Sequence, residues 1–555
     1  MYSIEEMCMI TRLGVEDRNI NSVYTVTPKK NNATKDPSFK GGNVWGALLW
    51  GIQKCEANPM VNVAVVDMFS AILPRTFVES MTNWFAGFEA FRRESSGLIV
   101  NCLIPSLVTF VGALALNKAI MPKGANMASC WADHSLIERA TETYTKSNAT
   151  DKVYDSLREI LGNTEGVHGK KKVLFKEAIR ENLDNYAQRL TKLTESNVSN
   201  KELSKEVEKI AKEIAEQTHV FENVKVKNGK EVSANTVKTL LEDTVKFFRE
   251  YKKTGKDINI EEFAKKSKKL VKGKTALGLA IILPLAASMQ YINRWITKKV
   301  SGVDGAPIYE DFGKNQNEEI RKQSQEGLLK QKIISISSMI GVSLLSMMKK
   351  PSWNMLEFKG WFPTMDQARI ISTTTFASRM AVADDKNELA ETTARDIVTF
   401  AGLYFLGDYA GKAAATLIEK KKGIQLLNSS KDLEKDANVF KRFWHWVKDV
   451  NIKSSEEVVS KTAELLKEKG LKPSEEQQKT ILKELKQAKN LRSACQVANL
   501  GVSLLLLGLI VPIWTRSSTK KKHAEALKQA DEKANLGINN ETKESKDSKL
   551  TMTKH

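Results

Sequence analysis

Two carboxylates interrupt apolar stretches of the chain, and they are its first candidates for chemistry. Asp67 lies in the segment VAVVDMF, and Asp408 lies in FLGDYAGK. A carboxylate in such surroundings can relay protons or bind a cation if the segment lies inside a membrane. Lys412 follows Asp408 by four residues on the same helix face, so an internal ion pair is the competing interpretation. For Asp67 the competing interpretation is that the carboxylate forms a salt bridge, or that its helix stays outside the lipid.

A metal site would need several ligands brought together. Cys130 and His134 are four residues apart and could share a helix face, but zinc takes three or four protein ligands. The other histidines and cysteines are scattered, and no CxxC pair occurs. The sequence therefore predicts neither a metal site nor a disulfide-stapled secreted domain.

Residues 162–171, GNTEGVHGKK, superficially resemble a phosphate-binding loop, but the residues that such a loop requires are missing. That loop needs G-x-x-x-x-G-K-[ST], in which backbone amides hold the phosphate and the hydroxyl binds Mg²⁺. Thr164 stands at the position of the first glycine and Lys171 at that of the hydroxyl residue. No G-x-S-x-G motif for a nucleophilic serine occurs either. We expect no catalytic residue, no cofactor and a protein that is not an enzyme.

Four long uncharged runs dominate the sequence and must position whatever chemistry it has. They are Ser95–Asn117, Thr275–Asn293, Ile333–Met348 and Ser493–Thr515, of 23, 19, 16 and 23 residues. At about 1.5 Å of rise per residue, 19–23 helical residues extend over about 28–35 Å, which matches a hydrocarbon core of about 30 Å. Three runs therefore fit a bilayer without adjustment, and the 16-residue run is short for one.

Aromatic and basic residues gather at the ends of these runs. Tyr291 and Trp295 close the second run, and Trp514 closes the last. Trp and Tyr at helix ends, with Lys and Arg just outside, are typical of helices anchored at a membrane surface. The formal net charge of +20 suits anionic headgroups. The basic residues that we expect to contact headgroups are Lys298, Lys299, Lys349, Lys350, Arg516, Lys520, Lys521 and Lys522.

Further stretches leave the number of spans open. Trp45–Ile52 and Val61–Leu73 are apolar but short, and they suggest a helical hairpin lying on or partly in the membrane. Ile397–Leu417 is long enough but carries Asp408 and Lys412, and a charge at mid-bilayer costs roughly 2.5–3.5 kcal/mol. That segment is either a helix inside a bundle or a helix outside the lipid. The positively charged residues of the loops do not show which side of the membrane each loop faces.

The polar residues between the first two runs are predicted to be helical. Within 122–274, apolar residues recur every three or four positions, as in Leu203, Val207 and Ile210. Asn163–Gly166 and Asn228–Gly229 are predicted to be turns between helices. The pattern indicates a charged antiparallel helical bundle outside the membrane.

A second polar segment, 423–492, combines aromatic and basic residues. Phe440 and Trp444 fall on one helix face beside Lys441 and Arg442. Aromatic positions next to basic ones are typical of an amphipathic helix at a membrane interface.

These observations predict an all-α fold: a polytopic helical membrane protein with an extramembrane helical bundle and interfacial amphipathic helices. The expected order is a flexible polar arm (1–42), a membrane-associated hairpin and first transmembrane helix (43–121), the charged bundle (122–274), two transmembrane helices (275–350), an aromatic interfacial segment with a possible further membrane helix (351–422), a charged helical segment with the interfacial helix (423–492), a last transmembrane helix (493–515) and a basic disordered tail (516–555).

The expected function is a non-enzymatic one, in which helical extramembrane regions bind a partner or organise the membrane. A transporter or channel built from four to five spans is the first alternative, and a membrane-inserting pore former is the second. The expected partners are a bilayer with anionic headgroups and a protein partner or a second copy, through the bundle. Nucleic acid is not expected, because no recognition module accompanies the basic residues, and no small-molecule substrate is identifiable.

Overall fold

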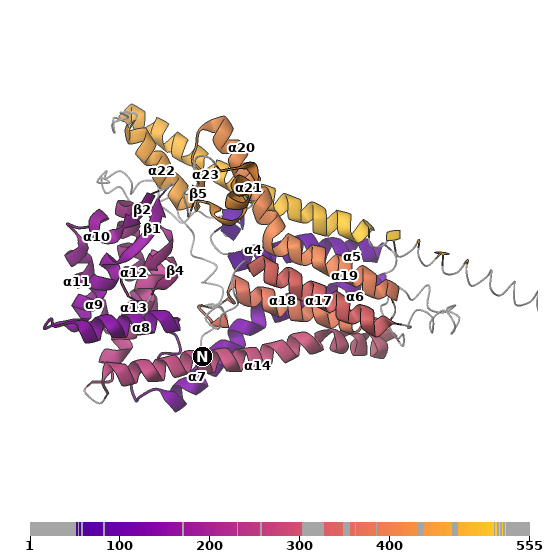
Figure 1. The fold of residues 1–555 in the computed structure, drawn as a ribbon, viewed down its shortest axis with the longest axis horizontal. Coiled ribbons are helices and arrows are strands. Elements are labelled where there is room, and N and C mark those ends of the chain that lie inside the picture. Colours follow the sequence, from indigo (N-terminus) through magenta and orange to yellow (C-terminus); the bar gives the residue numbers. More distant parts are fainter. Residues whose placement is uncertain are drawn as a thin grey trace, which may run out of the picture. The chain divides into compact units, whose positions relative to one another are not determined.

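The computed structural model is mostly helical (Figure 1). It describes residues 51–53, 55–56, 59–81, 84–168, 171–229, 231–255, 258–301, 327–347, 356–360, 362–384, 386–429, 437–468 and 475–514, with a few further positions up to 528. The predicted arm, 1–42, and most of the predicted tail lie outside these residues.

Contacts divide the chain into two compact units, each assembled from segments distant in sequence. Unit 1 consists of residues 1–59, 113–271 and 409–499, and unit 2 consists of residues 60–112, 272–408 and 500–555. The two polar segments that the sequence analysis separated fall, for the most part, within unit 1.

Unit 1 holds a helical layer and two small sheets. The first part contains α8 (His134–Lys146), α9 (Lys152–Gly162), β1 (Thr164–His168), β2 (Lys171–Leu174), α10 (Phe175–Ala178), α11 (Leu183–Glu195), α12 (Asn200–Thr218), β3 (Glu222–Val226), β4 (Val232–Thr236) and α13 (Val237–Lys252). The second contains most of α20 (Gly407–Lys422), then β5 (Leu427–Ser429), α21 (Val439–Lys448), β6 (Val450–Ile452), α22 (Ser455–Glu468) and most of α23 (Glu475–Ser503).

The sheet of the first part was not expected from the sequence. It is antiparallel, in the order β2-β1-β3-β4, and Val224 lies opposite Ala234. Asn228 and Gly229 have φ angles of 59° and 152° and form the turn of the β3–β4 hairpin, not a turn between helices. The strands are short and largely polar, so their alternation is too weak to signal a sheet.

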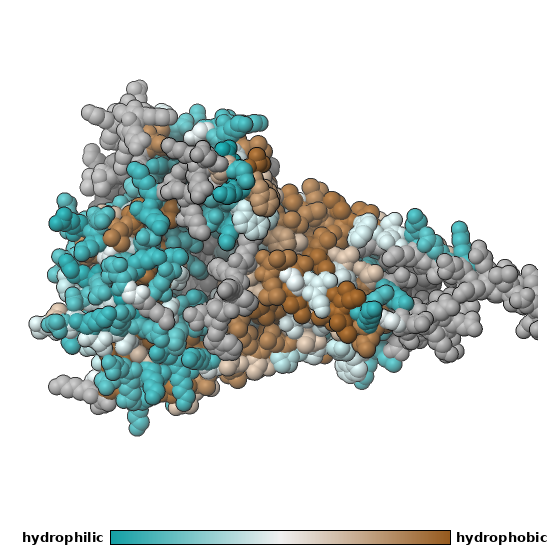
Figure 2. Space-filling view, viewed as in Figure 1, coloured by the Kyte–Doolittle hydropathy of each residue, from teal (hydrophilic) through white to brown (hydrophobic). Residues whose placement is uncertain are grey.

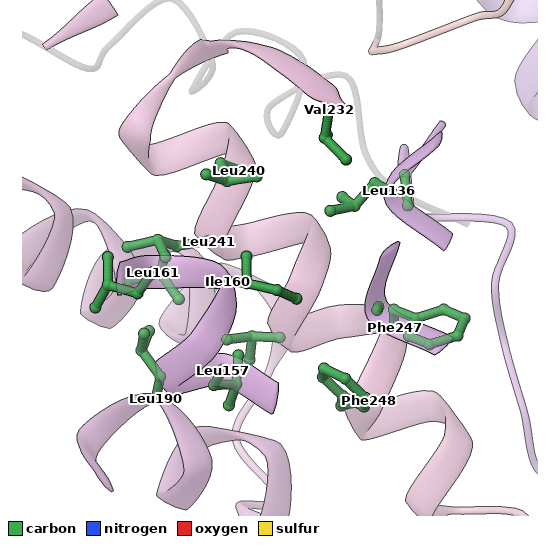
Figure 3. Packing of buried hydrophobic residues seen from close by; sticks show 14 of the residues in the cluster. Leu136, Leu157, Ile160, Leu161, Leu190, Val232, Leu240, Leu241, Phe247 and Phe248 are labelled. Atoms are coloured by element: carbon green, nitrogen blue, oxygen red, sulfur yellow. The ribbon is translucent and has the colours of Figure 1, made fainter. Parts of the chain in front are cut away.

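Apolar side chains of several helices, among them α8, α9, α11, α12 and α13, and of the sheet meet in the core of unit 1, part of which Figure 3 shows. Leu157 and Ile160 of α9 face Leu190 of α11 and Leu240 of α13, and all four are buried. The expected spacing in α12 is confirmed, because its residues at three- and four-residue steps are buried. The helix starts at a capping box in which Ser199 and Glu202 satisfy each other's backbone amides.

Unit 2 is built from long helices, several of which contain a π-helical turn. They are α4 (Pro59–Val66) with η1 (Asp67–Ile72) and α5 (Leu73–Ser80); α6 (Trp84–Leu98) with η2 (Ile99–Leu103) and α7 (Ile104–Ile120); α14 (Ile260–Ser301); α17 (Leu328–Met347); α18 (Met365–Ala381); α19 (Lys386–Ala401) with η5 (Gly402–Leu406); and η6 (Leu504–Ile510), which continues α23. Both α7 and α14 extend across the boundary into unit 1.

Five helices are long and apolar enough to cross a membrane, and we call them the candidate spans. They are Pro59–Ser80, Trp84–Ile120, Ile260–Val300, Leu328–Met347 and Thr480–Trp514. Each of the four uncharged runs lies within one of them, apart from the final residue of each of the last two runs, Met348 and Thr515.

The structure adds a candidate span in a segment that was expected to be too short for one. Val61–Leu73 belongs to a helical stretch of 22 residues, Pro59–Ser80. Arg75 does not end this stretch, because its side chain is buried in an ion pair inside unit 2. Ile397–Leu417 lies in the continuous helical segment α19–η5–α20 but is not among the five candidate spans.

On the face shown in Figure 2, hydrophobic side chains gather on the helices of unit 2, whereas unit 1 is mostly hydrophilic. Among the exposed residues are Phe77 of α5, Trp295 of α14 and Leu345 of α17. An exposed apolar surface of this extent is unusual in a protein surrounded by water.

The basic residues expected at lipid headgroups are only partly described. Lys298 and Lys299 lie exposed at the end of α14, and the Nζ atom of Lys299 is 4.7 Å from the ring centre of Trp295. Lys521 is exposed as well. Lys349, Lys350, Arg516, Lys520 and Lys522 lie outside the described residues.

Candidate functional site: a buried charge network

A chain of buried ion pairs connects four helices of unit 2. Glu94 of α6 accepts hydrogen bonds from Arg75 of α5 at 2.6 Å and from Arg379 of α18 at 2.8 Å. Arg379 also donates to Asp396 of α19 at 3.3 Å, and Arg395 donates to the same carboxylate at 2.9 Å. We call these five residues the charge network.

The charge network is shielded from the surroundings. Its side chains are between 0 and 11% exposed, and Asp396 is completely buried. Charges in a low-dielectric interior interact strongly, and removing one partner leaves the other uncompensated. The paired geometry therefore fixes α5, α6, α18 and α19 to one another.

Buried hydroxyl groups extend the polar interior along α18. Thr375 donates to Asn101 Oδ1 of η2 at 3.1 Å, and Ser372 lies 2.6 Å from the phenol oxygen of Tyr404 in η5. A capping box at Thr364 starts this helix, so its hydroxyl-rich face has a fixed register. The interior of unit 2 is thus lined by polar groups over several turns.

Several buried polar atoms of this interior lack a hydrogen-bond partner among the described residues. Within the described part of the chain, Arg379 Nε, Asp396 Oδ2 and Ser378 Oγ are buried and form no hydrogen bond. Buried polar atoms are nearly always satisfied, by protein, water or a bound solute. These three come from neighbouring positions of α18 and α19.

A second polar contact joins α6 to α14. Arg92 donates to the Asn293 backbone oxygen at 2.9 Å and to the Thr297 hydroxyl at 2.7 Å. Glu89 accepts from both Arg92 and Thr297, and Asn293 donates to Ser96 at 2.9 Å. The α6 helix therefore carries polar contacts on two of its faces.

The π-helical turns bring helices of unit 2 close together at small residues. Gly508 of η6 has the Ser70 backbone oxygen of η1 3.1 Å from its would-be Cβ position, and Gly402 of η5 has side-chain atoms of Leu507 at 2.9–3.0 Å. A π-turn inserts one residue into a helix, rotates the side chains that follow and recurs at functional sites.

The two carboxylates predicted from the sequence, Asp67 and Asp408, lie in different surroundings. Asp67 begins η1, is half-buried and interacts electrostatically with Glu94, Arg379 and Arg75, so it belongs to the surroundings of the charge network. Asp408 is exposed. Lys412 is buried and donates to the Val447 backbone oxygen of α21 at 3.1 Å. The ion pair between Asp408 and Lys412 stays a prediction.

The Cys130–His134 pair has other partners. The Cys130 thiol donates to the Asp243 backbone oxygen at 3.8 Å, and His134 Nε2 lies 3.2 Å from Glu138. No group of three or more histidine, cysteine or acidic side chains that could hold a metal occurs among the described residues.

Unit 1 contains a serine–histidine contact that the sequence did not reveal. His219 Nδ1 is 2.8 Å from the Ser460 hydroxyl, and the rings of His168 and His219 lie 5.1 Å apart. A serine nucleophile also needs nearby amides for an oxyanion. Ser460 is the sixth residue of α22, beyond the first turn, where backbone amides are already used by the helix. We assign it no catalytic role.

Beside this contact, unit 1 buries an acidic side chain. Burial, followed by the nearby charge of Glu222, raises the pKa of Glu457 to about 7. The carboxyl group of Glu457 is therefore partly protonated near neutral pH, which makes unit 1 sensitive to pH.

The charge network could not be predicted from the sequence, because its members are far apart along the chain. Glu94 and Arg379 are separated by 285 positions. In the sequence, Glu94 is simply the charged residue that precedes the uncharged run Ser95–Asn117. The segment STTTFASR of α18 carried a usable signal, since so many hydroxyls in one helix suit a polar interior. No family model, no curated protein and no solved structure matches this chain.

Proposed function

We propose that the protein is a multi-pass membrane protein whose unit 2 moves a small polar or charged solute across the bilayer. The observation that carries this proposal is the charge network, in which Arg75, Glu94, Arg379, Arg395 and Asp396 lie buried among helices with apolar outer faces. The proposal favours the transporter or channel alternative of the sequence analysis.

The argument is energetic. A single charged side chain costs roughly 2.5–3.5 kcal/mol in the centre of a membrane helix, and such residues in membranes commonly mark ion or substrate paths. Replacing a buried ion pair with well-packed apolar residues is often neutral or stabilising. An anchor alone would therefore be at least as stable with an apolar interior, so the network supports a function inside the bilayer.

The geometry supports a mechanism of exchanged partners. Arg379 donates to both Glu94 and Asp396, so it can keep one carboxylate while a solute takes the place of the other. The unpaired atoms Arg379 Nε, Asp396 Oδ2 and Ser378 Oγ supply both donors and acceptors along the same stretch. The hydroxyls of α18 would contact the solute next.

The test that needs no knowledge of the solute is water access to α18. A path across the bilayer exposes Ser378 to water in at least one state, so Ser378→Cys in proteoliposomes should react with a charged thiosulfonate that does not cross bilayers. The background is Cys8→Ser, because the described cysteines are buried: Cys55, Cys102, Cys130 and Cys495.

The matched control is Leu345→Cys on the exposed apolar face of α17, which lipid should protect. A Ser378→Cys reaction no faster than that of Leu345→Cys would contradict a transport path. In parallel, chloride flux reported by lucigenin and proton flux reported by pyranine should fall with Arg379→Gln. Both should be unchanged with Arg189→Gln, an arginine on the surface of unit 1.

A membrane-organising or partner-binding role is the second candidate, and the observation that favours it is unit 1. That unit has its own apolar core and a charged surface, which a transporter of this size does not require. Cross-linking of the full-length protein in native membranes would reveal a stoichiometric partner or a second copy under this role.

A further inference from the structure

The α21 helix of unit 1 is unusual in exposing aromatic side chains. Val439, Phe440, Phe443 and Trp444 are 84, 73, 57 and 51% exposed, and none of the residues of α21 is buried. Their spacing, at i, i+1, i+4 and i+5, places them on one side of the helix. Isolated exposed aromatics are ordinary, but four adjacent apolar positions on one face form a patch that calls for an occupant.

The opposite side of α21 is firmly attached to unit 1. Trp446 donates to the Thr416 hydroxyl of α20 at 3.3 Å, and His445 Nε2 lies 3.0 Å from the Ser429 hydroxyl of β5. Lys412 donates to the Val447 backbone oxygen at 3.1 Å. The helix begins at Asn438, whose side chain accepts from the Lys441 amide at 2.8 Å. The exposed face is therefore held in a fixed orientation.

Charge identifies the kind of occupant. The α21 helix carries Lys441, Arg442 and Lys448 and no acidic residue. The α20 helix, which contacts α21 through Lys412 and Thr416, ends in Lys420, Lys421 and Lys422. All six basic side chains are exposed. Aromatic side chains surrounded by lysine and arginine suit the boundary between acyl chains and anionic headgroups.

We propose that α21 docks on the surface of a bilayer that contains anionic phospholipid, with Phe440, Phe443 and Trp444 inserted below the headgroups. Lys441, Arg442 and Lys448 then contact phosphate groups at the level of the lipid surface. Docking depends on lipid composition, because apolar insertion and headgroup attraction both contribute to it. This property is independent of solute movement through unit 2.

The experiment compares full-length protein in nanodiscs of phosphatidylcholine with nanodiscs that also contain phosphatidylglycerol. Backbone amides of residues 439–448 should exchange with deuterium at least tenfold more slowly in the discs with phosphatidylglycerol, because the attraction of the basic side chains to anionic headgroups adds to apolar insertion. Fluorescence should be quenched by lipids brominated in the acyl chains, and Trp444→Phe should remove part of that quenching.

Two variants separate the contributions. Phe440→Asp combined with Phe443→Asp should abolish the slow exchange and the bromolipid quenching of Trp444. Lys441→Gln, Arg442→Gln and Lys448→Gln together should remove the difference between the two kinds of disc. The matched control removes three exposed lysines from α12, by Lys201→Gln, Lys205→Gln and Lys209→Gln, and should retain it. Circular dichroism checks that each variant is folded.

Slow exchange that is equal in both discs and in detergent would overturn the proposal, because it would show that protein covers the face, either another segment of this chain or a second copy. Absence of Trp444 quenching in both discs would overturn it too. Thiosulfonate access at Ser378 is measured separately, so failure of docking and failure of the proposed transport function are distinguishable.

Discussion

The two units of this protein distribute polarity in opposite ways. In unit 1, Leu157 and Phe248 are buried, and ion pairs such as Arg189–Glu213 lie at the surface. In unit 2, Arg379 and Asp396 are buried, whereas Leu345 is 76% exposed. Apolar burial is driven by water, so a chain segment surrounded by hydrocarbon has no reason to hide its leucines. The contrast is the one expected if unit 1 lies in water and unit 2, as proposed, lies in lipid.

The largest effect is expected where charge is buried. Glu94→Ala leaves Arg75 and Arg379 without their shared carboxylate, which should destabilise unit 2 by about 3–5 kcal/mol. Thermal or denaturant unfolding of the full-length protein in detergent measures the loss. Glu206→Ala, which removes one partner of an exposed pair in α12, is the control and should cost less than about 1 kcal/mol. Equal losses would remove the distinction between the units.

The same leucine substitution should give different results in the two units. Leu157→Ala opens a cavity in the core of unit 1 and should cost about 2–5 kcal/mol. Leu345→Ala removes an exposed side chain in unit 2 and should cost less than about 0.5 kcal/mol, as surface substitutions usually do. Unfolding in detergent compares the two. A large loss at Leu345 would indicate that protein, not lipid, covers this face of α17.

The stability of unit 1 should fall as pH rises, because of Glu457. Its pKa is raised from 4.5 to about 7, so the folded state holds a proton that the unfolded state has released. The stabilisation is complete below pH 4.5 and is lost as pH rises through 7, by roughly 1–3 kcal/mol. Glu457→Gln should flatten this dependence, measured as unfolding midpoints across the same range. If the unfolding midpoint of Glu457→Gln still changed with pH, the pH dependence would arise from another group.

The smallest effect is expected at the exposed ion pair between Arg189 and Glu213, which are 34 and 44% exposed. A double-mutant cycle with Arg189→Ala and Glu213→Ala should give a coupling free energy below about 1 kcal/mol that decreases in high salt. A coupling free energy as large as the destabilisation by Glu94→Ala would mean that burial does not explain the difference between this ion pair and the charge network.

The helical elements could largely be predicted from the sequence, because their signals are local. The runs at Ser95–Asn117 and Thr275–Asn293 lie within single helices, and the spacing in α12 and α13 predicted their buried faces. Leu174 shows the limit of such patterns. It continues the helical repeat of α11 in sequence but lies in β2. Leu174 is extended because β2 pairs with β1, and this pairing is a tertiary contact that a local pattern does not reveal.

The candidate site could be predicted only in part. Asp67 was identified because its charge interrupts an apolar stretch, and it does lie beside the charge network. Arg379 and Asp396 stand in ordinary polar surroundings in the sequence, and nothing local distinguishes them from surface charges. Their burial results from the packing of α18 and α19 against α6, a contact between distant segments.

The ion pair between Arg75 and Glu94 has a consequence for how the protein is made. Synthesis proceeds from the N-terminus at about 5–20 residues per second, and 285 positions separate Glu94 from Arg379. Glu94 is therefore made roughly 15–60 s before Arg379. Arg75 is made before it and lies on the adjacent helix, so it can neutralise the carboxylate throughout that interval. Arg93, whose Nε lies 3.5 Å from Glu94, is also made before α18, so Arg75 and Arg93 are the two counter-ions that Glu94 has while α18 does not yet exist.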